Sequence, residues 1–338
     1  MIRGRLSFKG SIDLNQFWPQ NIRAGVRYDS DADTVKVKID PQSVQFTSPA
    51  GGTKKTTVLS KAGFFHNIKS KNGTVTNKFK PVIDANGMIN MRLQGIDAPE
   101  LHYDTGTPLY RQHMGESSTV ALYNYLKGNV TGTTIACEVF TQVNRPNDIF
   151  DKYGRCVGDI VINEKGGKSQ NVNQWLIKNG YAFPAFYNSM TPDEITTIRT
   201  LADDAKKNNR EIWKYYSKRM AALDRSLTHP KNDPSYSKQS DEKPPVIFPK
   251  LFRRLWTFEI GESTRFSTQG YQKFLVKSAD KCCQTSTFLH NGYPSKNSPN
   301  LSDFVAQNGG INFDPAEIVF KEAGTSLKDK SGIPIRVF

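Results

Sequence analysis

The sequence has 338 residues and a mass of 38.0 kDa, enough chain for about two domains. A hydrophobic content of 37% excludes a chain that is disordered throughout, and no apolar run approaches the roughly 20 residues that a membrane-spanning helix needs. Lys and Arg number 46 against 32 Asp and Glu, a formal net charge of +14. This surplus favours an anionic partner, with a basic surface kept only for solubility as the alternative.

Four segments in which apolar and polar residues alternate are predicted to be half-buried strands. They lie at residues 34–39, 89–96, 133–140 and 156–163. In the first of them, for example, the three apolar residues of T-V-K-V-K-I occupy every second position. Turn residues lie between the last two of these predicted strands.

Three helices are predicted among and after these strands. The first covers residues 109–127, and the second is N-V-N-Q-W-L-I-K-N-G at residues 171–180, whose final glycine suits a left-handed cap. The third begins at the capping box T-P-D-E of residues 191–194 and continues with apolar residues at helical spacing. The order of strands, helix, strands and two helices predicts an α+β fold rather than an alternating doubly wound one.

Residues 41–88 form a basic insertion between the first two predicted strands. This stretch is rich in Gly, Thr and Ser and carries seven lysines but a single acid, Asp84. We expect a long loop or hairpin here. It is either a solvated insertion whose lysines protect strand edges, or an arm that binds phosphates.

A polar, proline-rich stretch at residues 229–245 has no apolar periodicity and is predicted to be a linker. We therefore expect a first domain at residues 1–220, a linker over 221–245 and a small C-terminal α+β domain at 246–338. Within that last part the sequence predicts strands at R-L-W-T-F-E-I, Y-Q-K-F-L-V-K-S and E-I-V-F-K-E-A, and a helix near L-S-D-F-V-A-Q. It contains no motif that indicates a function.

Acidic residues and arginines gather near strand ends in three motifs: D-A-D-T at residues 31–34, R-L-Q-G-I-D-A-P-E at 92–100 and D-K-Y-G-R at 151–155. Two carboxylates from separate strands, with a backbone carbonyl, form an all-oxygen set that suits Ca²⁺ or Mg²⁺. Two fixed arginines beside them suit the negative charge that develops when a phosphodiester is cleaved. Taken singly, the first and third motifs are more often structural turns.

In combination and order, these motifs resemble the staphylococcal nuclease (thermonuclease) family over about residues 22–216. The resemblance continues through V-N-x-x-L-I-x-x-G-Y-A and A-x-x-x-x-R-x-I-W further along the chain. It implies a five-stranded OB-type β-barrel with three helices. It also implies a Ca²⁺-dependent endonuclease that hydrolyses DNA and RNA and leaves 3′-phosphate ends.

The resemblance assigns roles to the carboxylates. Asp33, Asp97 and the backbone carbonyl of Ala98 match the ligands of the metal ion, and Asp31 would lie beside the metal as an outer carboxylate. Glu100 matches the residue that orients the attacking water. These assignments imply Ca²⁺ as the cofactor.

The resemblance also assigns the groups that contact the nucleic acid. Arg92 and Arg155 match the pair that stabilises the phosphate in the transition state, and Lys152 and Tyr153 match residues that contact the neighbouring phosphate. The tyrosines that cover the base in the family meet F-P-A-F-Y in this sequence, where we assign Tyr187 and keep its neighbouring phenylalanine as the alternative. The 48-residue insertion replaces a short turn of the family, so DNA-versus-RNA preference stays open.

Two further hypotheses accompany the nuclease assignment. One is a nuclease-like module with little or no turnover that binds nucleic acid or protein, although such modules usually lose the carboxylates or arginines that this sequence retains. The other is a nuclease whose C-terminal part binds an unknown partner. We expect a monomer without a membrane span. The first 20 residues lack a secretory signal, which favours the cell interior by default, or export if the sequence is trimmed.

Overall fold

The computed structural model describes residues 4–17, 30–70, 72–101, 103, 109–143, 146–225, 228–229 and 245–337. Five strands close into a barrel in the order β1-β2-β7-β11-β10 and back to β1. Their bounds are β1 Gly4–Asp13, β2 Thr34–Ile39, β7 Met88–Leu93, β10 Thr134–Val143 and β11 Cys156–Asn163. β7 and β11 pair in parallel, whereas the other neighbours are antiparallel. The predicted OB-type barrel is confirmed.

The apolar residues that alternate along the predicted strands are the residues that the structure buries. In β2, for instance, Val35, Val37 and Ile39 are buried in the barrel and the residues between them are more exposed. Two shorter strands, β3 Gln45–Thr47 and β4 Thr53–Lys55, extend the sheet beyond β1, and β12 Ser169–Asn171 pairs with β11. The barrel therefore encloses one apolar core, and its rim is free for polar side chains.

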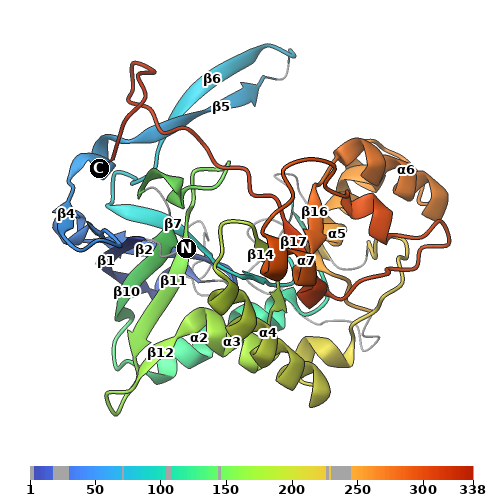
Figure 1. Cartoon of the computed structure of the whole chain (residues 1–338), viewed down its shortest axis with the longest axis horizontal. Coiled ribbons are helices and arrows are strands. Elements are labelled where there is room, and N and C mark those ends of the chain that lie inside the picture. Colours follow the sequence, from blue (N-terminus) through green and yellow to red (C-terminus); the bar gives the residue numbers. More distant parts are fainter. Residues whose placement is uncertain are drawn as a thin grey trace.

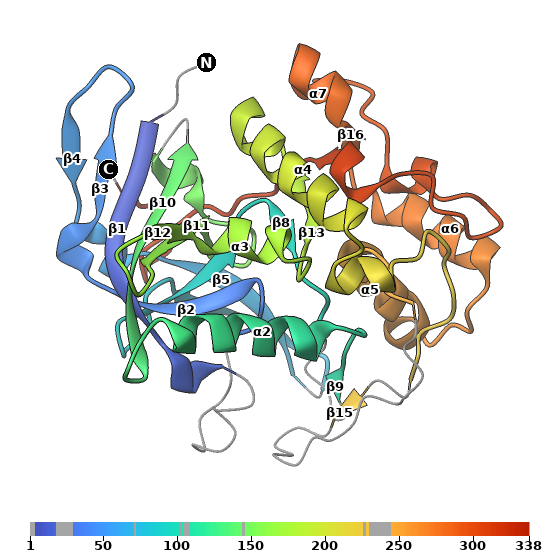
Figure 2. The same ribbon diagram turned by 90° about the horizontal axis from the view of Figure 1, so that it is seen from below.

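Helices α2 Gly115–Gly128, α3 Val172–Lys178 and α4 Pro192–Lys207 cover one side of the barrel (Figures 1 and 2). The second and third follow the predicted caps, since the Asn171 side chain caps α3 and a complete capping box opens α4. The predicted start of the first helix at residue 109 is wrong. Residues 109–110 form strand β9, Leu109–Tyr110, and α2 begins only after Met114 adopts a left-handed conformation with φ of 72°.

The insertion contains a long hairpin of β5 Gly63–Lys69 and β6 Val75–Pro81, which projects from the barrel (Figure 1). All but one of the β6 residues are exposed. The base of the hairpin contacts a distant part of the chain, because Gly63 and Lys328 bond to each other through their backbones. The hairpin expected from the sequence is therefore present and is anchored at its base.

The C-terminal segment, residues 245–337, contains the helices α5 Pro249–Trp256, α6 Thr268–Ser278 and α7 Thr285–Asn291 and the strands β16 Cys282–Gln284 and β17 Ile318–Phe320. A small α+β unit is thus present, as predicted. Two of the predicted strands are wrong, however, because R-L-W-T-F-E-I and Y-Q-K-F-L-V-K-S lie in helices. In α6, Tyr271, Phe274 and Leu275 are buried at helical spacing, which outweighs their preference for strands.

The apolar core consists of two clusters. The first fills the barrel. The second combines residues on either side of the predicted linker, among them Phe183 and Trp213 before it and Phe248 and Phe320 after it. Most of the linker, residues 226–227 and 230–244, lies outside the described residues, and the boundaries of the two domains stay a prediction. The second cluster nevertheless joins the C-terminal segment to the elements that follow the barrel.

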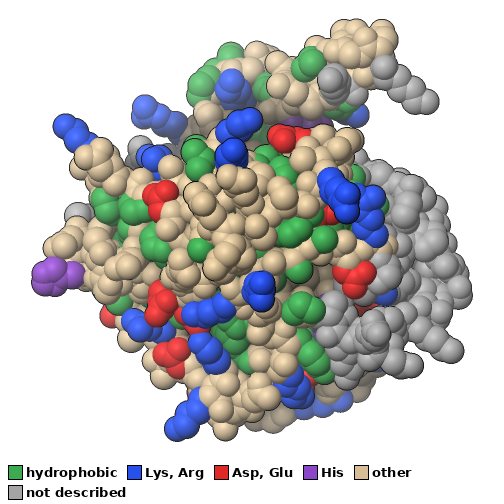
Figure 3. All heavy atoms as spheres, turned by 90° about the vertical axis from the view of Figure 1, so that its right-hand side faces the viewer, with side chains coloured by type: hydrophobic (Ala, Val, Ile, Leu, Met, Phe, Trp, Pro, Cys, Tyr) green, Lys and Arg blue, Asp and Glu red, His purple; other side chains and the backbone are tan. Residues whose placement is uncertain are grey.

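Three small pairings complete this junction. β8 Ile96–Asp97 pairs with β13 Phe183–Pro184, β14 Phe186–Tyr187 pairs with β17, and β15 Thr228–His229 pairs with β9. On the face of the molecule that includes the C-terminal segment, Lys and Arg side chains are spread widely and are not gathered into one patch (Figure 3). None of the helices in the described residues is long and apolar enough to cross a membrane.

Candidate active site

The candidate site begins where β2 and β7 lie side by side. Thr34 of β2 is opposite Arg92 of β7, so Asp33, the residue before β2, lies beside Arg92. After β7 the chain turns and returns as β8, which ends at Asp97. Two strand ends and one turn thus bring Asp33 together with Arg92 and Asp97, which lie about 60 residues further along the chain.

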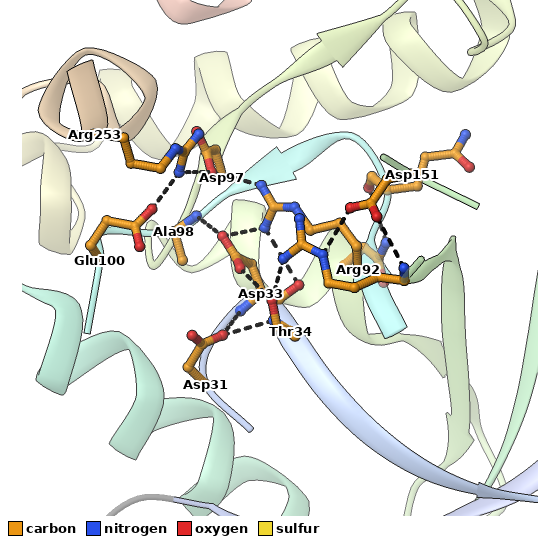
Figure 4. Close-up of polar contacts among 12 residues, drawn as sticks. Asp31, Asp33, Thr34, Arg92, Asp97, Ala98, Glu100, Asp151 and Arg253 are labelled. Atoms are coloured by element: carbon orange, nitrogen blue, oxygen red, sulfur yellow. Dashed lines mark hydrogen bonds and ion pairs between the residues drawn. The ribbon is translucent and has the colours of Figure 1, made fainter. Parts of the chain in front are cut away.

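Arg92 links the two carboxylates (Figure 4). Its Nη1 forms an ion pair with Oδ2 of Asp33, and its Nη2 lies 2.7 Å from Oδ1 of Asp97. The Ala98 backbone N–H donates to Oδ2 of Asp33 at 2.8 Å. The three residues predicted as metal ligands are therefore adjacent in space, with Arg92 bridging their carboxylates.

Asp31 shapes the turn before β2. Its Oδ1 accepts the backbone N–H groups of Asp33 at 3.1 Å and Thr34 at 2.8 Å, which is the geometry of a capped turn. Burial raises the pKa of Asp31 to about 7, and the charges of Asp33 and Glu100 add to this increase. Asp31 is therefore the residue that caps the turn, which is the structural role expected of this motif, and the side chain of Asp33 faces the site.

Glu100 lies on the loop that leaves β8, and Gln112 fixes this loop from behind. The Gln112 side chain accepts the Glu100 N–H at 3.3 Å, and the Gln112 N–H donates to the Glu100 carbonyl at 2.7 Å. Gly115 also packs against the Glu100 backbone, and a Cβ there would come within 2.3 Å of the carbonyl oxygen. The backbone that carries Glu100 is therefore held in a single position.

Arg155 reaches the site from the turn between the barrel strands β10 and β11. Its Nε donates to Oδ2 of Asp151 at 2.8 Å, and its Nη1 donates to the Thr34 hydroxyl at 3.1 Å. That hydroxyl in turn donates to Asp33 at 3.2 Å. Arg155 is thus one side chain away from the carboxylates that Arg92 bridges.

Lys152 and Tyr153 occupy the tip of this turn and face solvent. Tyr153 is 58% exposed, and the Lys152 ammonium lies 4.8 Å from the centre of its ring. Gly154 has φ of +74°, and a Cβ there would lie 2.0 Å from the ring of Phe64 in β5. The basic hairpin therefore packs directly on the turn that carries the predicted phosphate-contacting residues.

Tyr187 lies at the edge of the site in β14. It is half-buried and raises no steric conflict with the predicted role, whereas the neighbouring Phe186 is fully buried in the core. Burial raises the pKa of Tyr187, and the charges of Asp97, Arg92 and Arg253 act on it. Of the two alternatives for a base-covering ring, only Tyr187 is accessible.

The electrostatics of the cluster are set by burial and by mutual pairing. Burial alone would raise the pKa of Asp97, but the guanidinium groups of Arg253 and Arg92 hold it below its usual range. Burial alone would lower the pKa of Arg92, and the carboxylates of Asp33 and Asp97 raise it instead. Asp97 and Arg92 are therefore both charged at neutral pH.

Glu100 is the exception within this cluster. Burial raises its pKa to about 7, Arg253 partly offsets the increase, and the negative charges of Asp33 and Asp97 add to it. A carboxyl group with such a pKa can take up and release a proton near neutral pH.

Arg253 is the residue that sequence analysis missed. It belongs to α5 in the C-terminal segment, where no motif was found, yet its guanidinium contacts both Asp97 and Glu100 (Figure 4). It lies 153 residues from Glu100 along the chain. No local pattern could have assigned it to the site, because α5 reaches the site through long-range packing in the second apolar cluster.

The donor set suits a hard cation in its chemistry. Asp33, Asp97 and the Ala98 carbonyl offer oxygen atoms only, and the Ala98 backbone lies against Asp33. Among the described residues, no group of three or more His, Cys, Asp and Glu side chains is arranged to hold a metal ion. The predicted ligand set has only two such side chains, because its third ligand is a backbone carbonyl. A bound cation would share both carboxylates with Arg92.

A closed OB-type barrel with carboxylates and arginines converging at its rim defines the class of protein, and comparison with known sequences gives the family. Residues 90–215 match the family described as "Staphylococcal nuclease homologue", so this part of the chain is a staphylococcal nuclease homologue domain. Two similar proteins, from Escherichia coli O157:H7 and Escherichia coli, are each named "Uncharacterized endonuclease". Each is 26% identical over 132 residues, which are 39% of this chain and 67% of the relative.

The matched segment includes most of the predicted site but not all of it. Arg92, Asp97, Glu100 and Arg155 lie inside residues 90–215, whereas Asp33 lies before them. The structure brings Asp33 to the same place through β2. The family resemblance expected from the motifs is thus confirmed over residues 90–215, and the earlier strands complete the barrel.

Proposed function

We propose that this protein is a Ca²⁺-dependent endonuclease that hydrolyses phosphodiester bonds of DNA, RNA or both, and leaves 3′-phosphate ends. Nuclease function at the family level follows from the domain at residues 90–215. The metal, the product ends and the roles of individual residues are the proposal.

The observation that carries the proposal is the meeting of Arg92 and Arg155 with the carboxylates of Asp33, Asp97 and Glu100. Arg92 bridges Asp33 and Asp97, and Arg155 reaches Asp33 through the Thr34 hydroxyl. Arg253 joins Asp97 to Glu100, so one continuous chain of contacts links all five side chains. Structural salt bridges alone do not require so many buried charges at one barrel rim, because burying each one is costly.

In this proposal the nucleic acid binds with one phosphate between Arg92 and Arg155. Guanidinium groups can donate two parallel hydrogen bonds to phosphate oxygens, so both can stabilise the charge that accumulates as water attacks phosphorus. Lys152 and Tyr153, at the exposed turn, contact the neighbouring phosphate. Tyr187 covers the adjacent base by stacking, which tolerates any base.

Glu100 orients the attacking water and accepts its proton. Attack on phosphorus breaks the bond to the 5′-oxygen, so that one product keeps a 3′-phosphate and the other gains a 5′-hydroxyl. Asp33, Asp97 and the Ala98 carbonyl would hold Ca²⁺, which when bound would polarise the phosphate and offset its charge.

The test is cleavage of single-stranded DNA, double-stranded DNA and RNA in millimolar Ca²⁺, with a chelator control. We expect Ca²⁺-dependent products whose 5′ ends accept label from polynucleotide kinase without prior phosphatase treatment. Products that already carry 5′-phosphates would contradict the proposed bond cleavage, and undiminished cleavage in chelator would contradict the metal.

Variants test the roles of the residues. Arg92→Ala and Glu100→Ala should each lower kcat by a factor of about 10² to 10³, as expected for losing a transition-state donor or a general base. Glu211→Ala, at a half-exposed position on a 3₁₀ turn away from the site, is the matched control and should retain activity. Cleavage at the wild-type rate by Glu100→Ala would remove that residue from the mechanism.

The alternative is a nuclease-like module that binds nucleic acid without cleaving it. The retained arginines and carboxylates argue against it. Retarded mobility of intact substrate in every assay, with Ca²⁺ present, would favour it over the enzyme.

A further inference from the structure

The C-terminal segment contributes one charged group to the nuclease site. Nη1 of Arg253 lies 3.1 Å from Oδ1 of Asp97 and forms a short ion pair with Oε1 of Glu100, and Nη2 lies 2.9 Å from Oδ2 of Asp97. The Asp97 side chain is 1% exposed, that of Glu100 16% and that of Arg253 22%. In Figure 4, Asp97 lies between Arg253 and Arg92.

The helix that carries Arg253 is fixed on its other sides. Leu251, Phe252 and Leu255 are buried in the second apolar cluster. The next residue, Arg254, forms two hydrogen bonds with Asp280, at 2.6 and 2.7 Å. The guanidinium of Arg253 is therefore presented to the site by a packed helix and not by a loop.

Arg253 lies between two carboxylates of like charge, those of Asp97 and Glu100. The carboxylates of Asp97 and Glu100 are close enough to share one guanidinium, so their negative charges repel each other across a short distance. The planar fork of arginine can bond to both carboxylates at once, whereas a lysine ammonium offers a single point of charge. Without Arg253, repulsion would drive Glu100 away from Asp97.

We propose that Arg253 is a positioning residue of the nuclease site, which holds the Glu100 carboxylate beside Asp97 in the orientation that the attacking water requires. This inference rests on the proposed function of Glu100. It makes the C-terminal segment a necessary part of the active site, although the matched family segment ends at residue 215.

A plug that blocks the site would make the same contacts, and the packing of α5 argues against it. A plug must leave before substrate enters, but α5 shares its apolar cluster with Phe183 and Trp213 of the nuclease domain. Withdrawing α5 from the site would expose that cluster. The two ideas predict opposite signs of the activity change when Arg253 is replaced.

The experiment compares Arg253→Ala, Arg253→Lys and the control Lys277→Ala in the intact chain. We expect kcat of Arg253→Ala to fall about 10²-fold, the loss typical of a reacting group displaced by about 1 Å, with KM changed less than threefold. Arg253→Lys should recover only part of the loss. Lys277→Ala removes an equal charge from an exposed position of α6 in the same segment, and should keep kcat within threefold.

Chemical rescue separates positioning from a general structural effect. Added guanidinium at tens of millimolar should restore part of the kcat of Arg253→Ala, at ionic strength matched with NaCl, and should not restore Glu100→Ala. Absence of rescue in a folded Arg253→Ala, a kcat within threefold of wild type, or a rise in kcat would each overturn the inference.

A crystal structure of Arg253→Ala gives a readout that does not depend on activity. We expect the Glu100 carboxylate to move away from Asp97, and an unmoved Glu100 would overturn the inference. If the wild-type protein cleaves no nucleic acid, the proposed function fails by itself, and this structure still decides whether Arg253 positions Glu100.

Discussion

Replacing Phe248 with alanine tests whether the barrel and the C-terminal segment unfold as one unit. The Phe248 side chain is fully buried, and its ring centre lies 6.1 Å from those of Phe183 and Phe313 and 6.0 Å from that of Phe320. Truncating a buried phenylalanine costs about 3–5 kcal/mol of unfolding free energy. That is a large part of the roughly 5–15 kcal/mol that stabilises a typical protein.

The assay is hydrogen exchange followed by mass spectrometry, together with urea unfolding. We expect a single transition at lower urea, and a similar loss of protection in peptides from β10 and from α5. Val276→Ala is the control, because Val276 is 50% exposed on α6 and its truncation should change stability by less than about 0.5 kcal/mol. Two results would refute a shared folding unit: loss of protection confined to residues beyond 245, or a decrease in the free energy of unfolding of less than about 1 kcal/mol.

Three other predictions concern charge and backbone geometry. Burial first, and then the charge of Glu194, raises the pKa of Asp159 from 3.8 to about 7 in the folded protein. Because the unfolded chain loses this proton at lower pH, the free energy of unfolding should fall as pH rises from about 4 to about 7, by at most about 1.4 kcal/mol per pH unit. Asp159→Asn should abolish that slope in urea titrations. The double variant Lys78→Ala, Lys80→Ala, on the exposed strand β6, should weaken binding to a DNA duplex. The slope of log K against log salt concentration should become shallower by roughly 0.9 per lost phosphate contact. An unchanged slope would show that the insertion is only solvated. Gly154→Ala should lower the melting temperature, because its φ of +74° and the ring of Phe64 leave no room for a Cβ; a melting temperature equal to that of wild type would contradict this packing.

Much of the barrel could be predicted because its strands have one buried face. The alternation in residues 34–39 gives β2 with the same bounds, and the caps of α3 and α4 are local side-chain signals. The start of α2 could not be predicted in this way. Gln112 and Gly115 are held by the Glu100 loop, a contact that no periodicity reveals.

In the candidate site, too, some residues could be predicted from local sequence and one depends on packing. The motifs at residues 31–34, 92–100 and 151–155 identify side chains that a strand end or a turn presents, so their convergence follows from the barrel. Arg253 is different, because its position depends on how α5 packs. Its helix was even predicted in part as a strand, since Leu255, Trp256 and Phe258 favour either structure until their packing partners are known.

The pairing of β14 with β17 also bears on the order in which the molecule is completed. Tyr187 is in register with Phe320, and Asp151 forms a bridge with Gly324. A chain synthesised from its N-terminus contains Arg92 and Glu100 long before it contains these partners or Arg253. Contacts so distant in sequence carry a high cost of loop closure and form late. With the positioning role proposed for Arg253, the chain therefore completes its site only after the C-terminal segment has been synthesised and has packed.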